Sequence, residues 1–164
     1  MSCRVLIVDD EKCIGCRLCL VACAAHHDAG LNADRARLDV HKTGDLTYAP
    51  LVCNHCEVPS CARACPTGAC RVDEPGGRVV IDDRVCIGCR TCVVACPFQH
   101  ARFDKVLGVT VKCDFCDGAP VCVEVCEARA IRYVNADEAG LGRRREVGVR
   151  RVRPSLDAID SREP

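Results

Sequence analysis

The sequence is poor in the large side chains that usually fill a protein core. Its 164 residues include no tryptophan and one methionine, and aromatic residues make up only 3% of the chain. A chain of this length is suited to one compact domain, but aromatic side chains contribute little to its buried surface. Another kind of core must therefore compensate for them.

Long apolar runs are missing as well. No stretch approaches the roughly 20 apolar residues of a membrane-spanning helix. The first ten residues, MSCRVLIVDD, contain no basic segment followed by an apolar run and no twin arginine, so they do not resemble a signal peptide. We expect a cytoplasmic protein without a membrane span, unless a partner that carries a signal exports the chain with it.

Cysteine, by contrast, is abundant and regularly spaced. Sixteen of the 18 cysteines fall into four groups of four, each contained in a stretch of 11 to 14 residues. Groups one and three read C-x2-C-x2-C-x3-C, whereas groups two and four have four and five residues in the middle gap. In order, the groups are Cys13, Cys16, Cys19, Cys23; Cys53, Cys56, Cys61, Cys65; Cys86, Cys89, Cys92, Cys96; and Cys113, Cys116, Cys122, Cys126.

This spacing predicts iron–sulfur clusters. In bacterial ferredoxins the C-x2-C-x2-C-x3-C run binds one cubane with three thiolates and reaches a second with the fourth. Four thiolates per cluster predict four 4Fe–4S clusters, which we expect to serve as the core and to be needed for folding. Zinc ligand pairs usually stand a dozen residues or more apart, and disulfides need an oxidising compartment, so both are weaker alternatives.

The charge pattern argues against a nucleic-acid partner. Basic and acidic residues balance at 23 each, but four oxidised cubanes with their thiolates would add roughly −8, and nucleic-acid binding requires a basic surface. Residues 143–153 differ, with six arginines and one acid. We predict a basic C-terminal arm over residues 141–164, which either contacts an acidic partner surface or is solvated.

Cysteine groups one and three are copies of one unit. Residues 13–23 and 86–96 agree at nine of eleven positions. A group with a wider middle gap follows each of them, group two after group one and group four after group three, which indicates a duplicated dicluster unit. Between groups two and three, residues 74–77 (EPGG) separate two short β-prone runs and predict a hairpin. Because a two-cluster ferredoxin has this layout, groups two and three should exchange their fourth ligands.

If groups two and three share clusters, groups one and four are left to share the other two clusters with each other. Residues 5–8 lead into group one and residues 130–134 leave group four, and we expect these two runs to pair as strands. The fold class is therefore α+β, with short helices around residues 20–22 and 93–95. We expect a four-cluster domain at residues 1–140, made of two ferredoxin-like modules. The central module covers about 50–100, and the outer one about 1–30 plus 110–140, assembled from both chain ends.

Several single residues stand out beside the groups. Gly15 and Gly88 recur in the repeat, where a glycine permits a positive φ and close approach of the backbone to a cofactor. Cys3 and Cys70 lie outside every group and are expected to be small buried apolar residues. Lys112 adjoins a ligand; it either favours the reduced form of a cluster or is a solvated, screened charge.

A family resemblance rests on a set of motifs. They are Cys13-Ile-Gly-Cys16, Cys53-Asn-His-Cys56, Cys65-Pro-Thr-Gly68, Cys86-Ile-Gly-Cys89 and Lys112-Cys113-Asp-Phe-Cys116. On these, residues 3–140 resemble the four-cluster iron–sulfur subunits of prokaryotic oxidoreductases. Residues 32–38 and 143–146 look most like the small subunit of tungsten aldehyde oxidoreductases. Ala24 and Glu127 depart from the family, in which a proline often follows the last cysteine.

The resemblance implies how the ligands are shared. Groups one and four would form two clusters, and groups two and three the other two. The implied ligand sets are Cys13, Cys16, Cys19 and Cys126; Cys113, Cys116, Cys122 and Cys23; Cys53, Cys56, Cys61 and Cys96; and Cys86, Cys89, Cys92 and Cys65.

The implied function is electron transfer without catalysis. Such a subunit passes electrons between a catalytic oxidoreductase subunit, here most like a tungsten or molybdenum pterin aldehyde oxidoreductase, and a second acceptor such as a flavin/NAD subunit or a ferredoxin. The alternatives are the iron–sulfur subunit of a carbon monoxide dehydrogenase, formate dehydrogenase or hydrogenase, a free polyferredoxin, and a zinc-binding interaction module. Self-association is also allowed. The sequence contains no substrate-site motif and no glycine-rich nucleotide loop, so we expect no catalytic residues.

Overall fold

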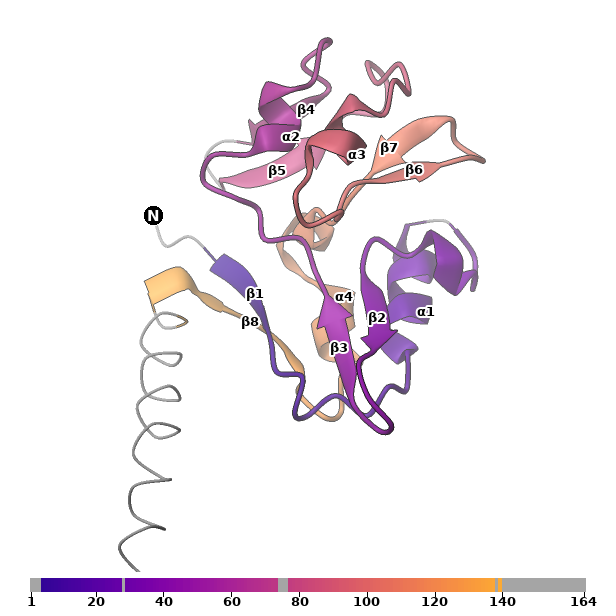
Figure 1. Cartoon of the computed structure of the whole chain (residues 1–164), viewed down its shortest axis with the longest axis vertical. Helices are drawn as coiled ribbons and strands as arrows, with labels where there is room; N and C mark the ends of the chain where they lie inside the picture. The colour runs from indigo at the N-terminus through magenta and orange to yellow at the C-terminus, as the bar shows by residue number, and fades with distance from the viewer. Residues whose placement is uncertain (1–3, 28, 74–76, 138, 140–164) are drawn as a thin grey trace, which may run out of the picture.

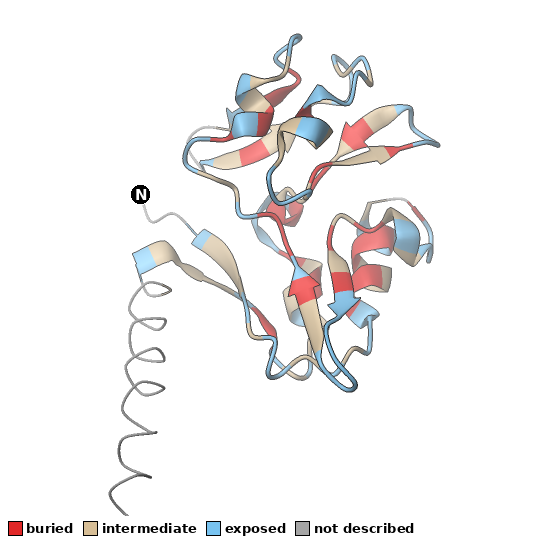
Figure 2. Ribbon diagram, in the orientation of Figure 1, coloured by how far each residue is buried: buried red, intermediate tan, exposed pale blue. Residues whose placement is uncertain are grey.

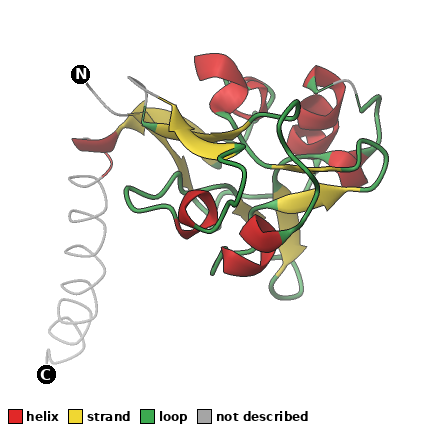
Figure 3. Cartoon of the chain, turned by 90° about the horizontal axis from the view of Figure 1, so that it is seen from above, coloured by secondary structure: helices red, strands yellow, loops and turns green. Residues whose placement is uncertain are grey.

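The computed structural model describes residues 4–27, 29–73, 77–137 and 139. Short helices and pairs of strands alternate along the chain and are joined by long loops (Figures 1 and 3). The helices are α1 (Leu18–His26), α2 (Ser60–Arg63), α3 (Thr91–Ala95) and α4 (Val121–Glu124), with 3-10 turns at Ala33–Arg35 and Phe115–Gly118. None of the helices in these ranges is long and apolar enough to cross a membrane. The chain has the small α+β architecture that the sequence predicts.

The strands pair two by two in antiparallel sheets. The pairs are β1 (Arg4–Val8) with β8 (Ile131–Asn135), β2 (Asp39–Lys42) with β3 (Tyr48–Leu51), β4 (Cys70–Asp73) with β5 (Arg78–Ile81), and β6 (Arg102–Asp104) with β7 (Val109–Val111). In Figure 1, β4–β7 gather with α2 and α3 in the upper half of the molecule. The lower half contains α1, α4 and the other two strand pairs. The chain therefore folds into two clusters of elements.

The predicted central hairpin is confirmed. Strand β4 pairs with β5 so that Cys70 stands opposite Ile81 and Asp73 opposite Arg78. Val79 of β5 is fully buried and packs with Cys61, Cys70 and Cys92. Cysteine side chains thus form most of the core of the upper half, where a larger domain would place aromatic residues.

The two ends of the described chain lie side by side in the lower half (Figure 1). Strand β1 pairs with β8 from Arg4 opposite Asn135 to Val8 opposite Ile131. Ile131 is buried in a core that it shares with Leu20 of α1 and with Leu38 and Val40. Figure 2 shows buried segments in red on α1 and β2 in this half. Contacts between residues more than 100 positions apart therefore hold this half together.

Helix α1 is longer than the sequence predicts, and a comparison with α3, the equivalent helix of the repeat, shows the reason. Both begin after an arginine with a left-handed backbone, Arg17 at φ 60° and Arg90 at φ 64°. Helix α3 ends at Ala95 because Pro97 keeps the preceding residue, Cys96, in an extended conformation. Ala24 stands at the position equivalent to Pro97, so α1 continues to His26.

Candidate metal centres

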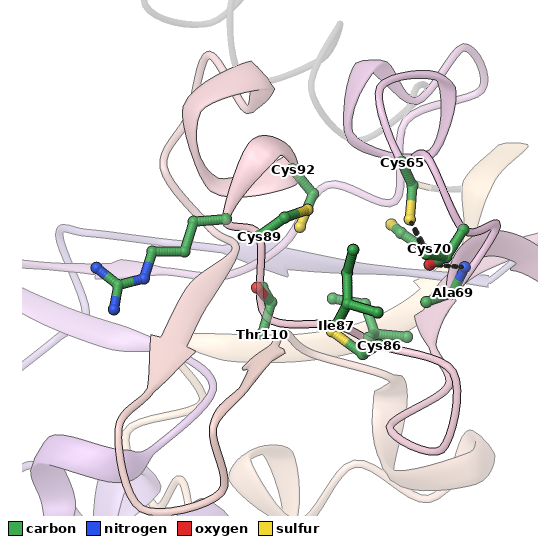
Figure 4. A pocket seen from close by; sticks show the side chains of 11 residues that line it. Cys65, Ala69, Cys70, Cys86, Ile87, Cys89, Cys92 and Thr110 are labelled. Atoms are coloured by element: carbon green, nitrogen blue, oxygen red, sulfur yellow. Dashed lines mark hydrogen bonds between the residues drawn. The ribbon is translucent and has the colours of Figure 1, made fainter.

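Five cysteines line a cavity in the upper half of the molecule (Figure 4): Cys70, which belongs to none of the four groups, and four group cysteines. Cys92 lies on α3, Cys86 and Cys89 precede that helix, and Cys65 follows α2. These are the four residues of one ligand set implied by the family resemblance, and we name them site 4. Backbone and side-chain groups point at two of the sulfurs: Cys70 N donates to Cys65 Sγ at 3.3 Å, and Thr91 Oγ1 donates to Cys89 Sγ at 3.3 Å.

A second cavity is lined by four more thiols. Cys53, Cys56, Cys61 and Cys96, here called site 3, share this cavity with two histidines, His55 and His100, and with Lys112. His55 Nδ1 accepts a hydrogen bond from Val79 N at 2.9 Å, which leaves the proton on Nε2. That buried Nε2 has no acceptor among the described residues. A donor without an acceptor and a cation on the wall fit an anionic group in this cavity.

The remaining thiols lie in the lower half, and the neighbours that raise their pKa values agree with the other two ligand sets implied by the resemblance. Burial raises the pKa of Cys19 to about 11, and its neighbours Cys16, Cys126 and Cys13 add to the rise. Burial likewise raises the pKa of Cys122, with contributions from Cys113, Cys116 and Cys23. We name the first four residues site 1 and the second four site 2. Both sets combine thiols from the beginning and the end of the chain.

The four sites follow one another in a row. Cys19 of site 1 also raises the pKa of Cys122 in site 2. Burial raises the pKa of Cys113 in site 2 to about 12, and Cys53 of site 3 adds to it. Between sites 3 and 4 lies Cys70, whose hydrogen bond with Cys61 lowers the pKa of Cys61 and which also interacts with Cys92. Neighbouring thiols thus link site 1 to site 2 and site 2 to site 3, and Cys70 links site 3 to site 4.

The donor sets suit iron–sulfur chemistry. Four like-charged thiolates cannot be buried together without a cation, since burial and mutual repulsion both favour the protonated thiol. A thiophilic metal removes these protons and supplies the cation. Backbone N–H groups aimed at sulfur, such as Arg37 N to Cys23 Sγ at 3.2 Å, stabilise the negative charge of a ligated thiolate. The residues present thus fit four-thiolate metal centres.

Two glycines of the repeat occupy positions where a side chain would collide. Gly15 has φ +70°, and an added Cβ would come within 2.6 Å of the Tyr48 ring. Gly88 has φ +67°, and its Cβ would come within 2.4 Å of the Gly108 carbonyl oxygen. Each glycine thus allows a neighbouring protein segment to pack closely against the loop that presents Cys16 or Cys89, and the predicted approach to a cofactor stays a prediction.

The remaining cysteines and the lysine are placed as follows. Cys70 is 2% exposed, in agreement with a buried role, whereas Cys3 lies outside the described residues. Lys112 is 3% exposed, so the expectation of a solvated charge is wrong. The sequence missed this because its burial depends on a partner carbonyl, that of Val79, 33 positions away.

Comparison with known proteins identifies the class. Two family profiles, each described as a 4Fe-4S dicluster domain, match residues 44–136 and 12–69. The chain belongs to the 4Fe–4S dicluster proteins. Two such domains account for up to four clusters.

Relatives of known role fall within oxidoreductase complexes. The polyferredoxin-like subunit of an aliphatic sulfonate oxidoreductase from Pyrococcus furiosus is 39% identical, over 74% of this chain and 70% of its own length. The thiosulfate reductase electron transfer subunit of Salmonella typhi is 36% identical, over 85% of this chain and 79% of its own. Among solved structures, the active-site complex of benzoyl coenzyme A reductase contains a chain with 25% identity and a TM-score of 0.47, over 82% of this chain and 76% of that one.

Proposed function

We propose that this chain is the electron-transfer subunit of an oxidoreductase complex and carries four 4Fe–4S clusters, one at each of sites 1 to 4. The observation that carries the proposal is the row of four thiol sets, each composed of the residues that the family pattern pairs. Each cluster would supply a centre that gains and loses one electron. The protein's part is to hold the four centres in order, exclude water from the inner thiols and direct hydrogen bonds to sulfur.

The proposed domain organisation follows from the same sets. Sites 3 and 4 use only residues of the central module, about 50–100, together with the hairpin β4–β5. Sites 1 and 2 draw on about 1–30 and 110–140, and the pairing of β1 with β8 brings these two segments together. We infer that the outer module is assembled from both chain ends, with all sixteen group cysteines as ligands and no catalytic residue.

Exposure suggests where electrons enter and leave. Cys16 at one end of the row and Cys89 at the other are exposed, whereas Cys53, Cys116 and Cys122 in the middle are buried. A row with accessible ends is suited to transfer between two partners. The first would be a catalytic oxidoreductase subunit and the second a flavin/NAD subunit or a ferredoxin.

The catalytic partner is proposed at the level of its class. The likeness of residues 32–38 to tungsten aldehyde oxidoreductase subunits favours that enzyme, but Arg35 pairs with Asp104 at 2.9 Å and Arg37 with Asp114 at 2.6 Å within this chain. These arginines are therefore explained by folding as well as by a partner. The similar segment at 143–146 lies outside the described residues. The names of the relatives offer sulfonate and thiosulfate enzymes as further candidates.

Purification of the native complex tests this function. A tagged chain isolated anaerobically from its own host should bring down a catalytic oxidoreductase subunit, identified by mass spectrometry, and should elute with it in gel filtration. An untagged strain is the control. A chain that elutes alone, holding its iron, would instead be a free polyferredoxin and would contradict a role as a subunit.

A further inference from the structure

A buried lysine lies where the two halves of the molecule meet. Lys112 follows β7 and directly precedes Cys113, the first ligand of the fourth cysteine group. Only 3% of its surface is exposed. Its Nζ donates to the carbonyl oxygen of Val79 in β5 at 2.5 Å and to that of Cys113 at 3.2 Å.

This ammonium group has no carboxylate partner in the described part of the chain. No ion pair within 4.0 Å involves Lys112 there, although most of the other partly buried cations, such as Arg35 and Arg78, have aspartate partners. Taking an isolated cation out of water costs several kcal/mol, and two neutral carbonyls offset only part of that cost. An anion close to Lys112 would offset the rest of that cost.

Thiols occupy the place where the anion is expected. Lys112 lines the site 3 cavity, and among its described lining residues it is the sole basic side chain apart from the histidines, with no carboxylate. Burial raises the pKa of Cys53, and the charge and hydrogen bond of Lys112 counteract the rise. Lys112 also helps to lower the pKa of Cys61, after the hydrogen bond with Cys70.

The two histidines of the same cavity do not share this role. His55 Nδ1 accepts a hydrogen bond from Val79 N, so that nitrogen carries no proton and the ring is neutral. Burial lowers the pKa of His100, and the charge of Lys112 adds to the effect. Lys112 therefore supplies the positive charge of this wall.

We propose that Lys112 is a built-in counter-ion of the metal centre at site 3, and that its charge favours the one-electron-reduced state of that centre. The inference rests on the proposed function, since it presumes a cluster at Cys53, Cys56, Cys61 and Cys96. Uptake of one electron from a reductant changes the charge of a four-thiolate cubane from about −2 to about −3, and no bond to Lys112 forms or breaks. A fixed cation attracts the more negative state more strongly, and the low dielectric of a buried site strengthens this preference.

Site 4 offers an internal comparison. Its cavity is lined by Arg90, which is exposed and lies over the Phe103 ring at 3.9 Å. An exposed charge is screened by water and salt. Lys112 should therefore favour the reduced state at site 3 more strongly than Arg90 favours it at site 4.

Three variants separate charge from anchoring. Lys112→Met keeps a long side chain and removes the charge, Lys112→Arg keeps the charge, and Lys105→Met removes an exposed lysine of the same region as a control. Each protein is purified anaerobically, its iron is counted, and its centres are titrated with dithionite while EPR is recorded. The signal that is lost in Cys61→Ser marks site 3.

The expected result is a lower midpoint potential at site 3 in Lys112→Met. The ratio of reduced to oxidised centre at fixed potential should fall about tenfold, which is about 59 mV for one electron. The midpoint potential should shift much less in Lys112→Arg, and not at all in Lys105→Met.

Failure of site 3 to assemble in Lys112→Met but not in Lys112→Arg would also show that the charge is required. An unchanged potential in Lys112→Met, or equal damage in both Lys112 variants, would overturn the counter-ion role in favour of simple anchoring. Wild-type protein without iron would instead overturn the proposed function.

Discussion

At the scale of single residues, the ligand loops are held by backbone conformations that few residues adopt. Arg17 and Arg90 have φ near +60° at equivalent places of the repeat, and Cys116 and Asp117 are left-handed as well. A left-handed conformation costs roughly 1–2 kcal/mol in a residue with a Cβ. Such strain persists only where the surrounding structure fixes it, and here it occurs beside the thiols of the proposed centres.

Gly88 allows the first residue-scale prediction. Gly88→Ala combines a left-handed Cβ with a contact of 2.4 Å to a backbone oxygen of Gly108, which cannot move freely. We expect a loss of about 2–5 kcal/mol in the free energy of unfolding, the sum of backbone strain and overpacking. Gly68→Ala is the matched control, because Gly68 has φ +70° but nothing within 4 Å of its added Cβ.

Thermal unfolding of the two holoproteins, followed under argon, measures the difference. The Gly68 variant should lose only the strain term, about 1–2 kcal/mol, and keep its iron. Equal destabilisation of both variants would show that the contact between the Gly88 loop and the β6–β7 turn does not affect the free energy of unfolding.

At the residue scale, sequence reasoning is strongest where the code is local. The ligand spacing specifies which thiols form a group, and two cavities are each lined by the four members of one predicted set, whereas the role of these thiols as ligands stays a prediction. Sequence reasoning did not foresee the burial of Lys112, because this depends on Val79, which is 33 positions away. No spacing rule connects these residues.

At the scale of elements, strand pairs with a local turn signal could again be predicted, whereas pairs that depend on long-range contacts could not. The β4–β5 hairpin is marked by a Pro-Gly-Gly turn and was predicted correctly. The pairs β2–β3 and β6–β7 have strands of three or four residues too, but they were missed because no Pro-Gly-Gly turn marks them. Long-range contacts help to hold them: Arg35 pairs with Asp104, and Arg102 donates to the carbonyls of Ala36 and Leu38.

Cys126 tests the link between the two ends of the chain. Cys126→Ser should damage site 1, because Cys126 lies beside Cys13, Cys16 and Cys19 and serine is a poor ligand for iron. We expect a loss of about four irons and of one EPR signal, with sites 3 and 4 intact.

The matched control for this variant is Cys70→Ser. Cys70 is a buried cysteine beside two sites, but it belongs to none of the sets, so this variant should keep all its iron. Loss of a site 3 or site 4 signal in Cys126→Ser would show that groups one and four do not share ligands.

At the scale of the whole molecule, polar contacts tie the two halves together around β5. Arg78 donates to Asp73 within its hairpin and also to Asp117 and the Asp114 carbonyl of group four, at 2.8 and 3.2 Å. Lys112 bonds to the next residue of β5, Val79. These contacts fix the spacing between sites 2 and 3, across which electrons would have to pass from one module to the other.

The basic arm belongs to this scale too, although it lies outside the described residues. Removal of residues 141–164 should leave every proposed centre in place, because the arm contains no cysteine. We expect weaker binding of the catalytic subunit, with a smaller dependence on salt, since charged arms act mainly on encounter. Co-purification across a salt series measures this, and binding that is unchanged at every salt concentration would reduce the arm to a solvated appendage.

The central claim is that four clusters form a row in one chain, and a metal count tests it most directly. Anaerobically purified protein should contain about sixteen irons and sixteen acid-labile sulfides per chain, from four cubanes with four thiolates each. Fully folded protein with about eight irons, or with zinc and no sulfide, would contradict the account.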